Sequence, residues 1–291
     1  MTQAIEAALR KRAQELLASG EVAQVIAWGS GRLTKQTAPL FVTTPEQADT
    51  IVFNDYCVNA LAKYAFTERD AGKLAVCVRG CEARGINRLI ADKQIEREQV
   101  YLLGIPCQGM KDRLSDEPLA KCVACTHRNP VIYDELLASE VTVPVVPVPQ
   151  SAAERFAEVK EIEAYTREER LALYNDAFDR CIRCYACREG CPVCTCRECF
   201  VDQSDVGWQG KQGNTDENRY YNLVRVFHIG DRCIECGECE RVCPMGLPLM
   251  TLNRKWIKDL DELFAAGEAG LTEELDNALG HYDVHDVEEF M

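Results

Sequence analysis

One cysteine pattern, C-x2-C-x2-C-x3-C followed by proline, occurs twice in the chain and constrains its fold more than any other feature. The first copy comprises Cys181, Cys184, Cys187 and Cys191, and the second comprises Cys233, Cys236, Cys239 and Cys243. The chain has 17 cysteines in 291 residues. Its N-terminus, MTQAIEAALRKRAQELLASG, has the spacing of an amphipathic helix and lacks the apolar core of a secretory signal. In a reducing compartment so many cysteines indicate metal binding, whereas a secreted disulfide framework is the alternative.

The spacing is the ligand run of ferredoxins, whose thiolates bind [4Fe–4S] clusters. Three thiolates separated by two residues can wrap one face of a cubane cluster, and the fourth must come from elsewhere, so each run lends its last cysteine to the other cluster. Cluster 1 is expected to use Cys181, Cys184, Cys187 and Cys243, and cluster 2 to use Cys233, Cys236, Cys239 and Cys191. One CxxC…CxxC pair would be ambiguous with a zinc ribbon, but two complete runs with proline favour iron–sulfur clusters.

The first half of the sequence has the alternation of an α/β domain with a largely parallel sheet. Apolar runs rich in β-branched residues predict strands at 22–28, 39–44, 50–55, 73–79 and 100–106. Helical patterns at 57–66 and 82–93 separate them. The proline-rich stretch at 141–150 predicts an extended linker between an α/β domain at 1–145 and a second domain at 151–291.

The second domain is expected to be a mainly helical α+β, ferredoxin-like unit with a helical C-terminal extension. The segment 151–180 is predicted to be helical, with Ser151 as its N-cap and Glu154 three residues later. Further helical patterns occupy 216–229, 250–266 and 271–279. The chain ends in the acidic tail HYDVHDVEEFM, which is either a docking peptide or a solvated end.

Four cysteines of the first domain lie in segments where α/β proteins place functional loops. Cys81 lies at a strand-to-helix turn in VRGCEARG, where a helix N-terminus favours a thiolate. Cys107 lies in the Gly/Pro-rich turn GIPCQGM, and Cys122 and Cys125 form a CxxC in KCVAC. Taken alone, this CxxC is a weak motif.

In this order, CVRGCEARGINRL, LLGIPCQGM and KCVAC resemble the cysteine positions of the beta-subunit family of coenzyme F420-reducing hydrogenases and dehydrogenases, which includes formate dehydrogenase beta subunits. Members of that family are iron–sulfur flavoproteins that pass electrons between a partner subunit and a flavin. The resemblance covers roughly residues 70–130 and implies that Cys81, Cys107, Cys122 and Cys125 bind a third [4Fe–4S] cluster, cluster 3. The ferredoxin module of family members commonly precedes this region, whereas here it follows it.

FAD is implied by the resemblance alone, since the sequence has no G-x-G-x-x-G fingerprint. Gly29 and Gly31 in WGSGR follow a predicted strand. They either cradle the flavin phosphate through backbone N–H groups or form a tight turn. Cys57 and Cys77 fall in a predicted helix and a predicted strand and are expected to be buried free thiols.

Three cysteines between the two runs remain without an assigned role: Cys194, Cys196 and Cys199. They either bind a further cluster or metal, with a fourth ligand from Cys57, Cys77 or a partner chain, or shape the loop around cluster 2 as buried thiols or hydrogen-bond partners of sulfur. The four histidines are scattered. Of these, His228 is expected to pack or to hydrogen-bond a cluster sulfur rather than to bind a metal.

These patterns predict an iron–sulfur electron-transfer subunit of a multi-subunit oxidoreductase, such as a hydrogenase, a formate dehydrogenase or a heterodisulfide-reductase-like complex. It would relay electrons between a catalytic partner subunit and a flavin subunit or another carrier. The alternatives are a flavin-bearing subunit that itself oxidises or reduces F420 or a nicotinamide, and a zinc-stabilised scaffold. No catalytic residue is predicted, because the sequence has no nucleophile–base arrangement and no P-loop.

The net charge of −14 argues against binding to nucleic acid or to anionic membranes. No apolar run approaches the length of a transmembrane helix. We therefore expect a cytoplasmic protein of anaerobic metabolism whose partners are other subunits of a redox complex.

Overall fold

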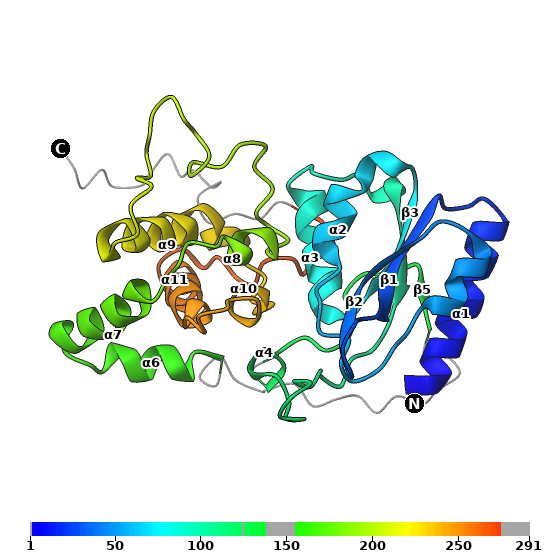
Figure 1. Cartoon of the computed structure of the whole chain (residues 1–291), viewed down its shortest axis with the longest axis horizontal. Helices are drawn as coiled ribbons and strands as arrows, with labels where there is room; N and C mark the ends of the chain where they lie inside the picture. Colours follow the sequence, from blue (N-terminus) through cyan, green and yellow to red (C-terminus); the bar gives the residue numbers. More distant parts are fainter. Residues whose placement is uncertain (1, 124, 138–154, 275–291) are drawn as a thin grey trace.

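The computed structural model describes residues 2–123, 125–137 and 155–274. These residues form two lobes that lie side by side (Figure 1). One lobe holds a β-sheet with helices on both faces, and the other consists of helices and loops. The expected fold class, an α/β part followed by a mainly helical part, is confirmed.

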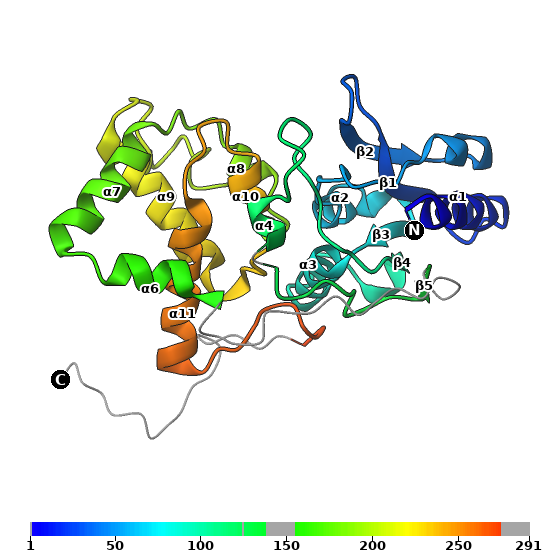
Figure 2. The same cartoon turned by 90° about the horizontal axis from the view of Figure 1, so that it is seen from below.

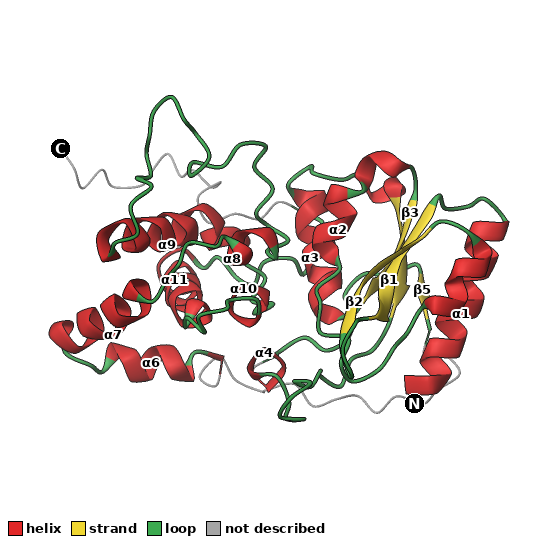
Figure 3. Ribbon diagram, viewed as in Figure 1, coloured by secondary structure: helices red, strands yellow, loops and turns green. Residues whose placement is uncertain are grey.

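Among the described residues, the sheet has five strands in the order β2-β1-β3-β4-β5 (Figure 3). The strands are β1 (Gln24–Ser30), β2 (Thr37–Val42), β3 (Leu74–Val78), β4 (Val100–Gly104) and β5 (Glu135–Leu136). β1 and β2 pair antiparallel, and the other neighbours pair parallel, as the largely parallel prediction requires. Every side chain of β3 is buried, as expected for the middle of a sheet covered on both faces.

Helices cover the two faces of this sheet. Helix α1 (Thr2–Ala18) lies on one face, and α2 (Ala62–Thr67) and α3 (Gly80–Ala91) lie on the other, towards the helical lobe (Figure 1). Because α3 follows β3 directly, its first turn lies at the carboxyl end of the central strand, the edge where parallel sheets form ligand sites. Short elements complete the lobe: η1 (Pro45–Thr50), η2 (Arg69–Ala71), η3 (Arg97–Gln99) and α4 (Ala120–Val123).

The strand predicted at 50–55 is wrong. The 3-10 helix η1 occupies the residues up to Thr50, and Ile51 forms only an isolated bridge with Gly29 of β1. Pro45 stands in the first turn of η1, where its fixed φ favours a helical start. The apolar side chains of this segment fill the core without a strand ladder.

The helix predicted at 57–66 begins later, at Ala62. A turn precedes it, because the side-chain oxygen of Asn54 accepts a hydrogen bond of 2.9 Å from the backbone N–H of Tyr56. Such local Asx turns compete with helix formation.

The helical lobe consists of α6 (Ala157–Glu163), α7 (Arg167–Asp179), α8 (Ala186–Glu189), α9 (Thr215–Ile229), η4 (Gly230–Arg232), α10 (Glu238–Arg241) and α11 (Leu249–Phe264). The predictions at 216–229 and 250–266 are confirmed by α9 and α11. The single helix predicted for 151–180 is instead divided at Thr166. The hydroxyl of Thr166 accepts from the Glu169 N–H, and the Glu169 carboxylate accepts from the Thr166 N–H, so a capping box starts α7 afresh.

The Ser151–Glu154 cap, the linker at 141–150 and the acidic tail lie outside the described residues, so the domain bounds stay predictions. Of the helix predicted at 271–279, only 271–274 is described, and that part is not helical. Within the described ranges, no helix combines the length and apolar character needed to cross a membrane.

Candidate metal centres

The two cysteine runs have the same backbone path. In each run, the second residue after the first cysteine and the residue after the second cysteine adopt left-handed φ values: Arg183, Tyr185, Glu235 and Gly237. One turn of helix follows in both runs, α8 and α10. Left-handed backbone is unfavourable for residues with a Cβ, so its repetition at matching positions indicates that the loop geometry itself is required.

The four cysteines predicted for cluster 1 line one cavity: Cys181, Cys184, Cys187 and Cys243. Two side chains of α9 approach their sulfurs from the helix. The Tyr221 hydroxyl is 3.3 Å from Cys187 Sγ, and Asn222 Nδ2 is 3.7 Å from Cys181 Sγ. Hydrogen bonds to sulfur favour the thiolate form and tune a cluster's potential.

The four cysteines predicted for cluster 2 lie close enough together for their charges to interact: Cys191, Cys233, Cys236 and Cys239. Burial raises the pKa of Cys233 to about 12 and that of Cys239 to about 11, and the nearby Cys191 thiolate raises both. Burial and Cys191 raise the pKa of Cys236 in the same way. Cys191 and Cys233 also pack in one small cluster of side chains. Four thiols gathered in this way are the donor set that a cubane cluster requires.

The four cysteines of the resemblance line a third cavity: Cys81, Cys107, Cys122 and Cys125. Cys81 stands in the first turn of α3, Cys107 in the loop after β4, and Cys122 on α4. Gly80 lets these segments meet, because a Cβ at this position would lie 2.1 Å from the carbonyl oxygen of His127. The structure thus brings together four residues that are up to 44 positions apart in sequence (125 − 81).

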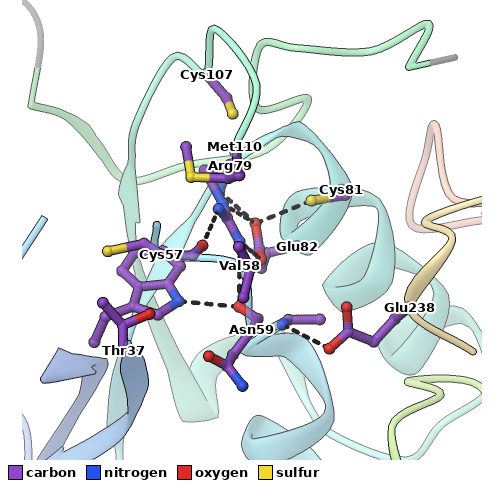
Figure 4. A network of polar contacts seen from close by, with 12 residues as sticks. Thr37, Cys57, Val58, Asn59, Arg79, Cys81, Glu82, Cys107, Met110 and Glu238 are labelled. Carbon is purple, nitrogen blue, oxygen red and sulfur yellow. Dashed lines mark hydrogen bonds and ion pairs between the residues drawn. The ribbon is translucent and has the colours of Figure 1, made fainter. Parts of the chain in front are cut away.

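A buried ion pair supports the turn that carries Cys81 (Figure 4). Arg79 is 2% exposed and Glu82 1%. The Arg79 guanidinium donates to Glu82 at 2.5 and 2.9 Å and to the Cys57 carbonyl at 2.5 Å. It also lies 4.6 Å from the centroid of the Trp28 ring. With so many fixed partners, Arg79 ties the start of α3 to the sheet.

The three cysteine sets form a continuous row across both lobes. Cys236 of the cluster 2 set also lines the cavity of the cluster 3 set. At the other end, Cys187 and Cys239 belong to the same buried cluster of side chains, which joins the cluster 2 and cluster 1 sets. The junction between lobes is held by the buried pair of Lys121 on α4 and Glu238 on α10, 2.7 Å apart (Figure 2 shows the two helices adjacent).

Arg225 of α9 lies between the cluster 1 and cluster 2 sets. It is 4% exposed, and its Nη2 donates to the Cys187 carbonyl at 3.1 Å. Its positive charge favours the ionised form of the Cys187, Cys191 and Cys239 thiols, which works to lower their pKa. A buried cation beside two anionic clusters favours their reduced states.

Replacing Arg225 with Gln is expected to lower the potentials of clusters 1 and 2, by roughly 60 mV for each 1.4 kcal/mol of lost interaction. Redox titration followed by electron paramagnetic resonance measures both potentials. The matched control is Arg219→Gln on the same helix, since Arg219 pairs with Asp216 near the surface. Equal potentials in the Arg225→Gln protein and the wild type would show that Arg225 does not act on the clusters.

Zinc, the alternative metal, limits how far apart its ligands can lie. Zinc holds its ligands at about 2.0–2.3 Å, so four ligands of one ion must converge closely. Within the ranges that the structure describes, no three His, Cys, Asp or Glu side chains converge closely enough to hold a single metal ion. The cysteine sets predicted for clusters 1 and 3 each line a cavity.

The glycines considered for a flavin phosphate serve the β1–β2 hairpin. Gly29 pairs with Ala38 inside the strand ladder. The N–H of Gly31 donates to the carbonyl of Gln36 at 2.7 Å and is not free to bind a phosphate. A Cβ on Gly31 would meet the Gln36 side chain at 2.6 Å, so the glycine is required by the turn. These two residues therefore do not fit the phosphate cradle, and the tight-turn alternative describes them.

Cys57 and Cys77 are fully buried in the core of the sheet lobe, as the sequence predicted. Burial raises the pKa of Cys57 to about 11, and burial also raises that of Cys77. We expect both to resist iodoacetamide in the folded protein, because a buried thiol is neither accessible nor ionised at neutral pH. Mass spectrometry after a labelling pulse tests this, and rapid modification of either residue before unfolding would contradict it.

The three cysteines left over by the sequence line one cavity in the helical lobe: Cys194, Cys196 and Cys199. Cys57 and Cys77, which the sequence left open as sources of a fourth ligand, belong to the core of the other lobe and do not line this cavity. Cys194 also hydrogen-bonds to Cys191, which lowers the pKa of Cys191. Cys194 also packs against the buried side chains that include Cys191, so it lies beside the cluster 2 set. His228 lines the same cavity.

Comparison with known families bears on the two cysteine runs of the helical lobe. Residues 177–247 match the family model of the 4Fe-4S dicluster domain. This part of the chain is therefore a dicluster electron-transfer domain, and it carries both cysteine runs.

Among individual proteins, the chain is 35% identical over 112 residues to the F420-dependent formate dehydrogenase subunit beta of Methanocaldococcus jannaschii. It is 50% identical over 36 residues to the F420-dependent formate dehydrogenase 1 subunit beta of Methanococcus maripaludis. The matches span 38% and 12% of this chain and 28% and 9% of the relatives' lengths. The chain is thus a distant relative of these subunits over a limited segment.

Proposed function

We propose that the chain is an iron–sulfur electron-transfer subunit of a multi-subunit oxidoreductase. It relays electrons between a catalytic partner subunit and a flavin or another carrier. The observation that carries the proposal is the row of three cysteine sets, in which Cys236 of one set lines the cavity of the next. One-electron carriers bound at all three sets would connect the two lobes.

The protein's own residues hold, space and shield these sites. The cysteines of cluster 1 are assigned as Cys181, Cys184, Cys187 and Cys243, those of cluster 2 as Cys191, Cys233, Cys236 and Cys239, and those of cluster 3 as Cys81, Cys107, Cys122 and Cys125. Burial of Cys187, Cys191 and Cys239 keeps water from the junction of clusters 1 and 2. The exposed Cys184 places the cluster 1 end of the row at the surface, where a partner can approach.

The partner is proposed to be a dehydrogenase or hydrogenase catalytic subunit. The two relatives are named as subunits of F420-dependent formate dehydrogenases, which supports assembly of this chain into a complex of that kind. A separate flavin subunit is the proposed second partner, since Gly29 and Gly31 serve a hairpin.

The test uses the full chain, purified anaerobically and reduced by dithionite. We expect magnetic interaction between neighbouring reduced clusters in its electron paramagnetic resonance spectrum, and electron transfer to one-electron dyes. We also expect no turnover with reduced F420 or NADH, because those hydride donors need a flavin. Stoichiometric bound flavin together with steady turnover of either donor would refute the relay and favour a flavin-bearing subunit that reacts with the carrier itself.

A further inference from the structure

We propose that the cavity lined by Cys194, Cys196 and Cys199 binds a fourth [4Fe–4S] cluster, with His228 as its fourth protein ligand. This site lies outside the three sets assigned above. The three cysteines and the histidine come from two elements, the loop after α8 and the last turn of α9, and all four line the same cavity.

The position of His228 is fixed by an aromatic contact. Its ring packs edge-on against Phe200, with 5.2 Å between the ring centroids. Phe200 directly follows Cys199, so the imidazole is held beside the cysteine loop. His228 is exposed on its helix rather than packed into the core, and an imidazole in that position is available as a ligand. Histidine thus supplies the fourth ligand that neither Cys57 nor Cys77 can supply.

The charge of the cavity fits an anionic occupant. Five cationic side chains line it: Lys63, Arg188, Arg197, Arg225 and Arg232. The two carboxylates of the lining, Glu189 and Asp202, both pair with Arg188, at 2.8 and 2.6 Å. The formal excess is three positive charges (5 − 2) before any thiol ionises. A cluster bound by three thiolates would offset this excess.

A buried donor without a partner gives independent support. Arg225 is only 4% exposed, and its buried Nε has no hydrogen-bond partner among the described residues. A buried N–H of a charged group without an acceptor destabilises the fold. An anionic sulfur in the cavity that Arg225 lines would supply an acceptor.

The loop that carries the three cysteines is also held in place by a contact with the sheet lobe. Lys63 of α2 donates a hydrogen bond to the Cys194 carbonyl, which fastens the cysteine loop to the sheet lobe. Because the Cys194 side chain packs against the small buried cluster that contains Cys191, the fourth cluster would adjoin cluster 2 and form a branch of the row. Loose structural thiols would need neither the anchored loop nor the excess of positive charge.

The test compares full-length Cys196→Ser and Cys199→Ser proteins with the wild type, all purified anaerobically. Each variant is expected to lose about four irons and four sulfides per chain while retaining the other three clusters, because one cubane contains four of each. Cys57→Ala is the control, since Cys57 is a buried core thiol away from the cavity, and it should leave the metal content unchanged.

A second measurement does not depend on those cysteines. In the reduced wild type, pulsed electron paramagnetic resonance should detect nitrogen coupling from a histidine ligand. His228→Cys should abolish that coupling and keep the iron. Unchanged iron in both serine variants, absence of the nitrogen coupling, or one zinc per chain at this site would each overturn the proposal. None of these outcomes affects the proposed relay through clusters 1 to 3. Failure of the relay proposal would instead appear as absence of those three clusters from the wild-type protein.

Discussion

The Cys107→Ala protein is expected to contain about four irons and four sulfides fewer per chain than the wild type, the content of one cubane cluster. Cys107 lines the cavity that also holds Cys81, Cys122 and Cys125. Removing one of four thiolates opens a corner of cluster 3, and no other cysteine lines that cavity except Cys236, which is assigned to cluster 2. Clusters 1 and 2 should remain, because their ligands come from the two runs.

Iron and acid-labile sulfide analysis measures this effect, and circular dichroism verifies that the variant is folded. The control is Cys57→Ala, which removes a thiol of the same lobe that lines none of the cavities described. An iron content equal to that of the wild type would show that the four N-terminal cysteines bind no cluster. The row would then end at cluster 2.

Replacing Arg79 with Met is expected to reduce the free energy of unfolding by about 3–5 kcal/mol, because it leaves the buried Glu82 carboxylate without its cation. Arg79 and Glu82 have side-chain exposures of 2% and 0%, so water cannot replace the lost partner. Arg79 also donates to the Cys57 carbonyl, which would lose that donor. The variant should release cluster 3 first, since the start of α3 carries Cys81.

Anaerobic urea denaturation followed by circular dichroism measures the change in stability. The control is Lys35→Met, which breaks an exposed pair with Asp116 whose side chains are 41% and 53% exposed. Exposed pairs of this kind contribute little to stability, because water screens their charges. If Arg79→Met costs no more than Lys35→Met, the Arg79–Glu82 pair does not support the site.

The cysteine sets of clusters 1 and 2 could be assigned from the sequence because their chemistry is local. Cluster geometry dictates the spacing of Cys181 to Cys191, and the repeat at Cys233 to Cys243 supplies the exchange of the fourth ligand. The largely parallel character of the sheet was also accessible in outline, since buried β-branched runs alternate with helical patterns. The helix from 216 to 229 was found within one residue of its observed start at Thr215.

Other features depend on contacts between distant segments, which a periodic pattern does not encode. The pair of Lys121 and Glu238 joins residues 117 positions apart, and the charge of Arg225 lies near thiols of both cysteine runs. One weak signal existed for the Arg79–Glu82 pair: opposite charges three residues apart at a predicted strand-to-helix turn. The strand predicted at 50–55 failed because the apolar side chains of Ile51 and Phe53 fill the core from an irregular segment after the 3-10 helix, without a strand ladder.

The proposed role of His228 is another feature that the sequence pattern does not encode. A single histidine in an amphipathic helix is usually a packing residue, and nothing in the sequence relates it to Cys199. Only the fold brings the last turn of α9 to the loop after α8, where the Phe200 ring holds the imidazole. The three unassigned cysteines acquire a candidate partner through that tertiary contact.

The most direct test of the central claim is the metal content of the full chain purified without oxygen. Three cubane clusters require about twelve irons and as many acid-labile sulfides per chain, and the fourth cluster raises both to about sixteen. A content of at least twelve irons with equal sulfide and no zinc is the result predicted here. A content of about eight irons or fewer, or zinc in place of iron, would contradict a relay of three clusters across the two lobes.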